Sequence, residues 1–221
     1  MTAVRVRKPV YPLDLLWNLT LRELRGKYKR SILGWGWSVI NPIVQLAVYS
    51  FVFGVLFKSQ PPPGDPSGMT VYAFFLVSAF LPWVFHQNAV MGALTTLSGN
   101  GNLIRKVYFP RSILPFASSL SWLVTFAVEM SVLLFVLAVF QSVKWQVVPL
   151  IVLASILLMF FSLGVGLVAS AVNVYFRDVE YLTMIGLQVW FWATPVVYSV
   201  TLVTQRQPPL KIGTIGVITL Y

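Results

Sequence analysis

The sequence predicts an all-α integral membrane protein, in which an amphipathic N-terminal helix precedes five membrane-spanning helices. Of the 221 residues, 57% are hydrophobic and 10% are charged, whereas a soluble domain has about 25% charged residues. Several apolar stretches reach about 18 residues or more, the length that a helix needs to cross the hydrocarbon core of a bilayer. These stretches are continuously apolar rather than alternating, which favours helices over a β-barrel.

The charged residues exclude several kinds of chemistry. The net charge is +10, but in a membrane protein basic residues mainly hold cytoplasmic loops in place, so we expect membrane lipids and not nucleic acid as partners. The chain has one histidine, no cysteine and six scattered acidic residues, which do not assemble a metal cluster or a catalytic carboxylate pair. It also lacks the phosphate-binding loop of nucleotide-binding proteins and a cleavable signal peptide. We therefore predict no enzyme activity and no cofactor.

The first element is a basic tail followed by an interfacial helix. Residues 1–12 are expected to form a cytoplasmic tail, and residues 13–30 an amphipathic helix lying in the membrane interface. Its apolar face spans about 140° of the helix circumference. That face comprises Leu13, Leu16, Trp17, Thr20, Leu21, Leu24 and Tyr28. Lys27 intrudes on this face, where it could pair with Glu23 one turn earlier or extend toward water.

The five spans follow. They are expected at about 32–57, 69–90, 113–140, 148–172 and 181–200, with 201–221 as a re-entrant or outer segment. Glycines at 34 and 36 predict a bend where the first span begins, and those at 164 and 166 predict close helix contact. Pro42 predicts a kink or a restart of the first span, and prolines at 82 and 195 predict helix interruptions.

The basic residues predict which loops are cytoplasmic. Eight of the sixteen Lys/Arg lie at or before Arg30, three lie in residues 91–112, and one is Arg177. The segments assigned to the outside hold only four. Because basic residues are enriched on the cytoplasmic side, twelve against four predicts a cytoplasmic N-terminus.

Some residues within the spans have two open interpretations. Glu129 is the only acid inside a span, and a charge there is costly, so it either serves a substrate pathway or coupling step or is a hydrogen-bonded packing residue. His86 is more typical of a hydrogen-bonded helix residue than of a proton relay. The aromatic groups around Tyr49 and Phe53, and around Trp190 and Trp192, either form an interfacial belt or stack on sugar rings.

Four blocks of sequence resemble one family of transporters. Residues 21–35, with Trp37 and Asn41-Pro42, are similar to the N-terminal signature of ABC-2 type permeases that export polysaccharides. This family includes the membrane subunits of O-antigen, teichoic acid and mycobacterial galactan exporters. Residues 102–111, 175–179 and 194–198 match its later landmarks in family order. Each block alone is weak, but together they are specific.

The resemblance implies an architecture and a set of partners. We expect a homodimer with six spans per chain, of which the sixth is absent from these residues. Two copies of a separate ATPase would carry ATP and Mg²⁺. Residues 99–111 would form the main coupling helix on the ATPase, and 173–180 a second contact. The implied coupling residues are Asn102, Leu103, Arg105, Lys106, Tyr108, Phe109, Arg111, Arg177 and Asp178.

The resemblance also implies a lateral gate and a substrate path. The gate and interfacial helix would involve Trp17, Arg22, Arg25, Lys27, Tyr28, Arg30, Trp35 and Trp37. The path between protomers would involve Tyr49, Phe53, Glu129, Trp190 and Trp192.

The expected function is export of a lipid-linked polysaccharide across a bacterial plasma membrane. Three alternatives remain. An ABC-2 exporter of drugs or small lipids should lack the long amphipathic signature before Gly34-Trp35. A membrane-embedded glycosyltransferase would require acidic motifs at loop edges, and only Asp178 and Glu180 lie together on the inside. A passive channel or scaffold would need no ATPase.

Overall fold

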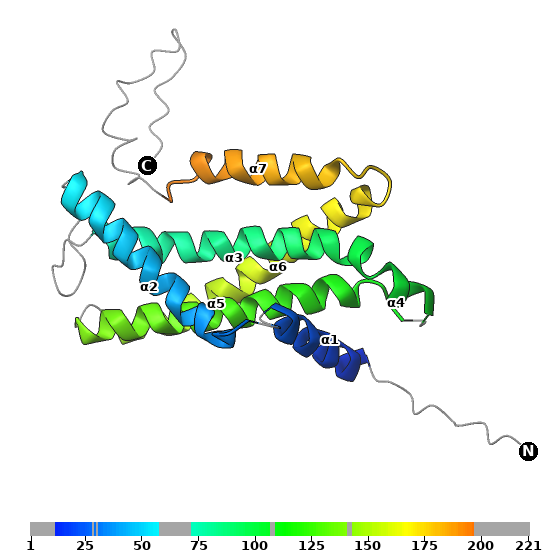
Figure 1. The fold of residues 1–221 in the computed structure, drawn as a ribbon, viewed down its shortest axis with the longest axis horizontal. Coiled ribbons are helices and arrows are strands. Elements are labelled where there is room, and N and C mark those ends of the chain that lie inside the picture. Colours follow the sequence, from blue (N-terminus) through cyan, green and yellow to red (C-terminus); the bar gives the residue numbers. More distant parts are fainter. Residues whose placement is uncertain are drawn as a thin grey trace, which may run out of the picture.

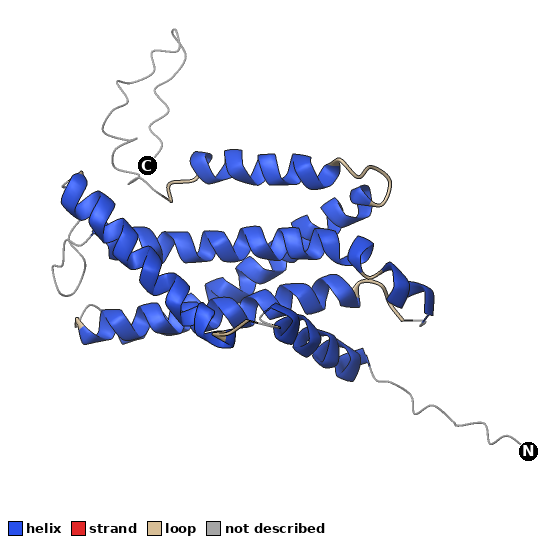
Figure 2. Cartoon of the chain, viewed as in Figure 1, coloured by secondary structure: helices blue, strands red, loops and turns tan. Residues whose placement is uncertain are grey.

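The computed structural model describes residues 12–27, 29, 31–57, 72–106, 109–140 and 143–196. Every regular element within them is helical, as predicted (Figure 2). In chain order these elements are α1 (Pro12–Lys27), the 3-10 turn η1 (Gly34–Gly36), α2 (Trp37–Tyr49), the π-helical η2 (Ser50–Leu56), α3 (Tyr72–Gly99), α4 (Gly101–Lys106), α5 (Ile113–Val139), the 3-10 turn η3 (Trp145–Val147), α6 (Val148–Asn173) and α7 (Val179–Ala193).

Four helical segments are long and apolar enough to cross a membrane. They are Gly34–Leu56, Tyr72–Gly99, Ile113–Val139 and Trp145–Asn173, and they correspond to the first four expected spans. The second runs to Gly99, beyond the expected end at residue 90. The helix at the fifth expected span, α7, has 15 described residues, about 22 Å of helix. Residues 197–221, with the remainder of that span and the predicted re-entrant segment, lie outside the described residues, as does the tail at 1–11.

Helix α3 is the centre of the bundle. It packs against α2, α5, α6 and α7 (Figure 1), and 44% of its most apolar window is buried, against 6% for Gly34–Leu56. It also has the lowest mean hydropathy of the four spans, 1.3 against 2.6 for Trp145–Asn173. A helix surrounded by other helices need not be apolar all round, so α3 accommodates polar side chains that lipid would not.

The main core lies between α3, α5 and α6. It is formed by Val77, Leu81, Phe85, Ala89, Phe126, Leu133 and Met159. The rings of Phe85 and Phe126 stack with centroids 5.0 Å apart. Helix α6 approaches α3 closely at Gly166, where a Cβ atom would lie 2.6 Å from the Cβ of Ala93. The predicted close contact is therefore confirmed at Gly166, but it is wrong at Gly164, which has open space around it.

Not every predicted interruption is present. Both α2 and α3 continue through Pro42 and Pro82, so a restart at Pro42 and an interruption at Pro82 are absent. Surrounding helices let a membrane-spanning helix tolerate a missing backbone donor. The first span instead changes geometry after Tyr49, where it becomes π-helical.

The other two predictions of irregular backbone are confirmed. Gly34 has a φ of 50°, which only glycine adopts without strain, so the chain bends there. At the far end, α7 stops at Ala193, and Thr194 is extended with ψ 138°, the conformation favoured before a proline.

Both predicted cytoplasmic loops lie at one end of the bundle. Figure 1 shows α4 and the turn between α6 and α7 at the same end, toward which α1 also lies. The connection between α5 and α6 lies at the opposite end. The elements that hold the basic residues, α1, α4 and the α6–α7 turn, therefore lie toward one end of the bundle.

Candidate functional site

The interfacial helix and the predicted coupling segment (residues 99–111) share one apolar cluster. Leu19 of α1 is buried against Leu114 and Ala117 of α5. Partly buried around them are Leu15, Leu16, Leu97, Leu103, Ile104, Phe109 and Ile113. Leu103 and Phe109, which we expected to contact an ATPase, thus pack against the body of the permease. They fix the position of the coupling segment beside α1.

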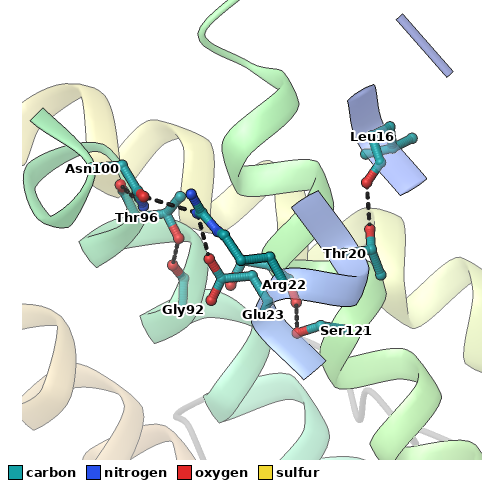
Figure 3. A network of polar contacts seen from close by, with 9 residues as sticks. Leu16, Thr20, Arg22, Glu23, Gly92, Thr96, Asn100 and Ser121 are labelled. Carbon is teal, nitrogen blue, oxygen red and sulfur yellow. Dashed lines mark hydrogen bonds and ion pairs between the residues drawn. The ribbon is translucent and has the colours of Figure 1, made fainter. Parts of the chain in front are cut away.

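A polar link joins the same two elements. The guanidinium of Arg22 donates to Asn100 Oδ1 at 2.8 Å and pairs with Glu23 at 2.9 Å (Figure 3). Asn100 in turn donates from its amide to the Thr96 carbonyl at 3.0 Å, and Thr96 donates to the Gly92 carbonyl. These hydrogen bonds therefore connect residue 100, in the predicted coupling segment, to α1 and to the last turns of α3.

The remaining coupling residues face outward. Asn102, Arg105, Lys106 and Arg111 are exposed around α4, and Arg177 and Asp178 are exposed in the α6–α7 turn. None of the four basic side chains forms an ion pair with a described residue, so their charges are free to meet a partner. Tyr108 lies outside the described residues.

Several of the predicted gate residues have exposed side chains. Arg25 is exposed, Trp17 is 56% exposed, and Leu13 is exposed beside it, so part of the predicted apolar face remains available to lipid. Trp35 and Trp37 are both exposed near η1, and Trp37 Nε1 donates to Ser31 Oγ at 3.1 Å. Tyr28 and Arg30 lie outside the described side chains.

Lys27 adopts neither of the two arrangements that the sequence suggested. Its Nζ donates to the Ser121 carbonyl at 3.2 Å and to Thr125 Oγ1 at 3.0 Å, and it lies 3.3 Å from the centroid of the Trp122 ring. Glu23 pairs with Arg22 instead. Lys27 therefore enters the bundle at the end of α1 and attaches that helix to α5 through hydrogen bonds and a cation–π contact.

The environment of Lys27 changes its ionisation. Burial lowers its pKa to about 7, and the attraction of Glu129 and then of Glu23 opposes that shift. The buried amine therefore loses its proton more readily than an exposed lysine does. The position of Trp122 beneath it depends on Gly92, where a Cβ would lie 2.8 Å from the Trp122 Nε1 atom.

Lys27 and Glu129 line the same cavity, which we call the polar cavity. It has a volume of about 340 Å³ and lies between α1, α2, α3 and α5. Its lining residues are Lys27, Asn41, Gln45, Leu81, Val84, Asn88, Trp122, Thr125 and Glu129. The buried Oε1 atom of Gln45 has no hydrogen-bond partner among the described residues. A cavity with three amides, a hydroxyl, an amine and a carboxyl is unusual within membrane spans, because each group must be hydrogen-bonded or hydrated.

A second cavity, of about 240 Å³, is mainly aromatic. It lies between α3, α6 and α7, and among its lining residues are Trp83, His86, Phe161 and Trp190. His86 Nδ1 lies 2.7 Å from Ser162 Oγ, so it is a hydrogen-bonded helix residue as expected. Its other ring nitrogen, Nε2, is buried without a partner in the described structure.

The predicted path aromatics belong to one continuous chain of rings. Tyr49 contacts Phe53 and Phe80, with centroids 6.3 Å and 5.7 Å apart. Phe80 contacts Phe191 at 6.1 Å, and the chain continues to Trp83 and Trp190. Trp192 contacts Phe191 at 5.2 Å. The two aromatic groups that the sequence places in the first and fifth spans are therefore bridged by α3.

Several site residues were missed by the sequence reasoning. Gln45 and Asn88 were not singled out, although amide side chains within an apolar span generally face the protein interior. Phe80 and Trp83 flank Pro82, but they are not distinguishable by sequence from lipid-facing aromatics. Only the packing of α3 between α2 and α7 shows that they bridge the two groups.

These features define a multi-pass helical membrane protein with one basic end, an amphipathic N-terminal helix attached to the segment after α3, and polar and aromatic cavities among its spans. The sequence profile of the ABC-2 type transporter family matches residues 14–207. The chain therefore belongs to the ABC-2 type transporter family.

Similar proteins of known name agree with this membership. The chain is 31% identical over 201 residues to an O-antigen export system permease protein RfbA of Klebsiella pneumoniae, covering 89% of this chain and 73% of that protein. A second protein of that name from the same organism is 28% identical over 201 residues, with the same coverage. The protein of that name from Myxococcus xanthus is 32% identical over 190 residues, covering 85% of this chain and 69% of its own length.

Proposed function

We propose that this chain is the permease subunit of an ATP-driven exporter that moves a lipid-linked polysaccharide outward across the bacterial plasma membrane. The similarity to three O-antigen export permeases over most of the chain supports this substrate class. ATP hydrolysis would occur on two copies of a separate cytosolic ATPase. Two copies of the permease would enclose the path between them.

The observation that carries the proposed mechanism is the attachment of α1 to the coupling segment. The Arg22–Asn100 hydrogen bond and the apolar cluster around Leu19 connect the two elements. A partner that pushed on α4 would move α1 with it. The bend at Gly34 then lets α1 shift while α2 stays in the membrane.

The charge distribution supports a cytoplasmic position for this end. Arg105, Lys106, Arg111 and Arg177 are exposed there and have no described acidic partner. In membrane proteins, loops rich in Lys and Arg generally lie on the cytoplasmic side. They are also suited to an acidic surface on an ATPase.

The test is charge reversal at the coupling segment. Replacing Arg105, Lys106 and Arg111 together with Glu should reduce export of surface polysaccharide at least about tenfold, because the partner then meets like charge. Cell-surface polysaccharide would be measured in cells whose own copy of the gene is deleted. The matched control is Lys29→Glu, an exposed charge outside the coupling segment.

Membrane abundance of the variant would be measured beside export. Normal abundance with lost export supports coupling through this segment. Unchanged export would contradict the coupling claim. Unchanged surface polysaccharide after deletion of the gene itself would instead favour an exporter of drugs or small lipids.

A further inference from the structure

The polar cavity contains groups that the coupling mechanism does not use. Lys27 attaches α1 to α5. The cavity is also lined by Asn41 and Gln45 of α2, Asn88 of α3 and Glu129 of α5. Gln45 Oε1 is buried and has no hydrogen-bond partner in the described part of the chain. A buried acceptor left without a donor is destabilising, so this oxygen requires a donor from a ligand or a water molecule.

The chemistry of the lining discriminates between ligand classes. A phosphate would meet the carboxyl of Glu129 together with a single amine, Lys27, which already donates to Ser121 and Thr125. Burial moreover lowers the pKa of Lys27 to about 7, which weakens its hold on the positive charge that a phosphate needs. A metal cation would meet a single carboxyl, Glu129, and the described residues hold no group of three His, Cys, Asp or Glu side chains that could bind it. A lipid chain would leave the amides and the carboxyl without hydrogen bonds.

A neutral polyhydroxyl compound suits this lining better than any of these. Sugar hydroxyls both donate and accept hydrogen bonds. The three amides of the lining also donate and accept, and the carboxylate of Glu129 accepts. The volume of about 340 Å³ is at the lower end of the range for small-molecule sites, roughly 300–1,000 Å³. It therefore suits one sugar ring and not an oligosaccharide.

We propose that the polar cavity is a binding site for one sugar ring of the lipid-linked glycan, whose hydroxyls form hydrogen bonds with Gln45, Asn88 and Glu129 beside α1. This inference rests on the proposed export function, and it assigns the recognition of sugar to a site beside the interfacial helix. The glycan's lipid tail stays in the bilayer, and its phosphates remain outside this cavity. The site would thus distinguish a loaded carrier from an empty one.

The test compares two probes on the purified full chain. One is a polyprenyl diphosphate carrying a single N-acetylhexosamine, and the other is the same polyprenyl diphosphate without sugar. Gln45→Met and Asn88→Leu remove polar groups from different helices at little change in volume. Each should weaken binding of the sugar-bearing probe at least about fivefold, the effect of a lost buried hydrogen bond. Binding of the sugar-free probe should be unchanged.

The matched control is Gln87→Leu, which removes an amide from the adjacent position on α3 but does not line the cavity. It should bind both probes as the wild type does. Thermal stability provides a second readout. Gln45→Met should not lower the melting temperature of the ligand-free protein, because the replaced acceptor has no partner to lose. A purely structural role of Gln45 would give a lower melting temperature.

The outcomes separate the inference from the proposed function. If the variants bind the sugar-bearing probe like the wild type, or weaken both probes equally, the sugar site is contradicted while the export function stands. If the wild type binds neither probe, the proposed substrate class itself fails, and the sugar site fails with it.

Discussion

At the scale of single residues, the contacts of Lys27 explain why a basic residue lies on the apolar face of α1. Its place on the apolar face of α1 looks like an exception, yet it reaches Ser121, Trp122 and Thr125 of α5. Thr20 and Leu24 of the same helix are also buried. The packed stripe of α1 is thus centred on the Lys27 side, and Trp17 is left to the membrane.

The lowered pKa of Lys27 predicts a pH dependence of stability. Its pKa is 10.5 in a model compound and about 7 in the folded protein. Between these values the unfolded chain binds more protons, so the free energy of unfolding rises with pH from about 7 upward. The melting temperature of the purified wild type should therefore rise between pH 7 and 9, by at least about 2 °C.

Lys27→Met should remove most of that rise, and Lys29→Met, an exposed neighbour, should keep it. The measurement is a thermal melt at each pH in a fixed detergent. Equal rises in the wild type and in Lys27→Met would show that Lys27 is not the titrating group.

Gly166 predicts a local effect on stability. A Cβ there would lie 2.6 Å from Ala93 Cβ and 3.1 Å from the Val90 carbonyl oxygen. Gly166→Val should therefore push α6 from α3 and cost about 1–3 kcal/mol, the usual effect of overpacking. Gly164→Val is the matched control, because nothing lies within 4 Å of its Cβ position. Comparable melting temperatures for the two variants would contradict the close contact.

At the scale of elements, the connection between α1 and the coupling segment is the central feature. It consists of an exposed hydrogen bond and a buried apolar cluster. The apolar cluster provides most of the stability, since an exposed charged contact contributes at most about 1 kcal/mol. The Arg22–Asn100 bond is better regarded as a directional link between two elements that must move together.

This link predicts non-additive effects on export. Arg22→Ala and Asn100→Ala should each reduce ATP-dependent export about two- to fivefold, and the double variant should be no worse than the more impaired single variant. Asp14→Ala, an exposed change on the same helix outside the predicted gate residues, should have little effect. Export by the four proteins in one background measures this. Fully additive losses would show that the two residues act independently.

The sequence predicted the elements better than their contacts. Continuous apolar runs determine α2, α3, α5 and α6, because length and hydropathy are properties of each segment alone. The helices continue through Pro42 and Pro82, because neighbouring helices decide whether a proline interrupts a span. The meeting of Lys27, Gln45, Asn88 and Glu129 could not be predicted, because it depends on how four helices pack together.

At the scale of the whole molecule, most of the described basic residues lie toward one end of the bundle, and the polar cavity and aromatic rings lie within its spans. One end has the basic coupling segment, the α6–α7 turn and nearby α1 (Figure 1). The spans between the ends contain a polar cavity beside α1 and a chain of aromatic rings from α2 through α3 to α7. In the proposed function, the polar cavity would receive a glycan near the cytoplasmic side. The aromatic rings would guide it outward, because aromatic faces stack well on sugar rings.

The central claim, that this chain moves lipid-linked glycan in an ATP-dependent way, is tested most directly in inverted membrane vesicles. The vesicles would contain this chain with its partner ATPase and a labelled lipid-linked glycan, exposed to an added glycosidase. We predict that ATP protects the glycan by moving it into the vesicle lumen, and that vesicles lacking this chain give no protection. Glycan that stays equally sensitive to glycosidase with and without ATP, in vesicles that contain both proteins, would contradict the claim.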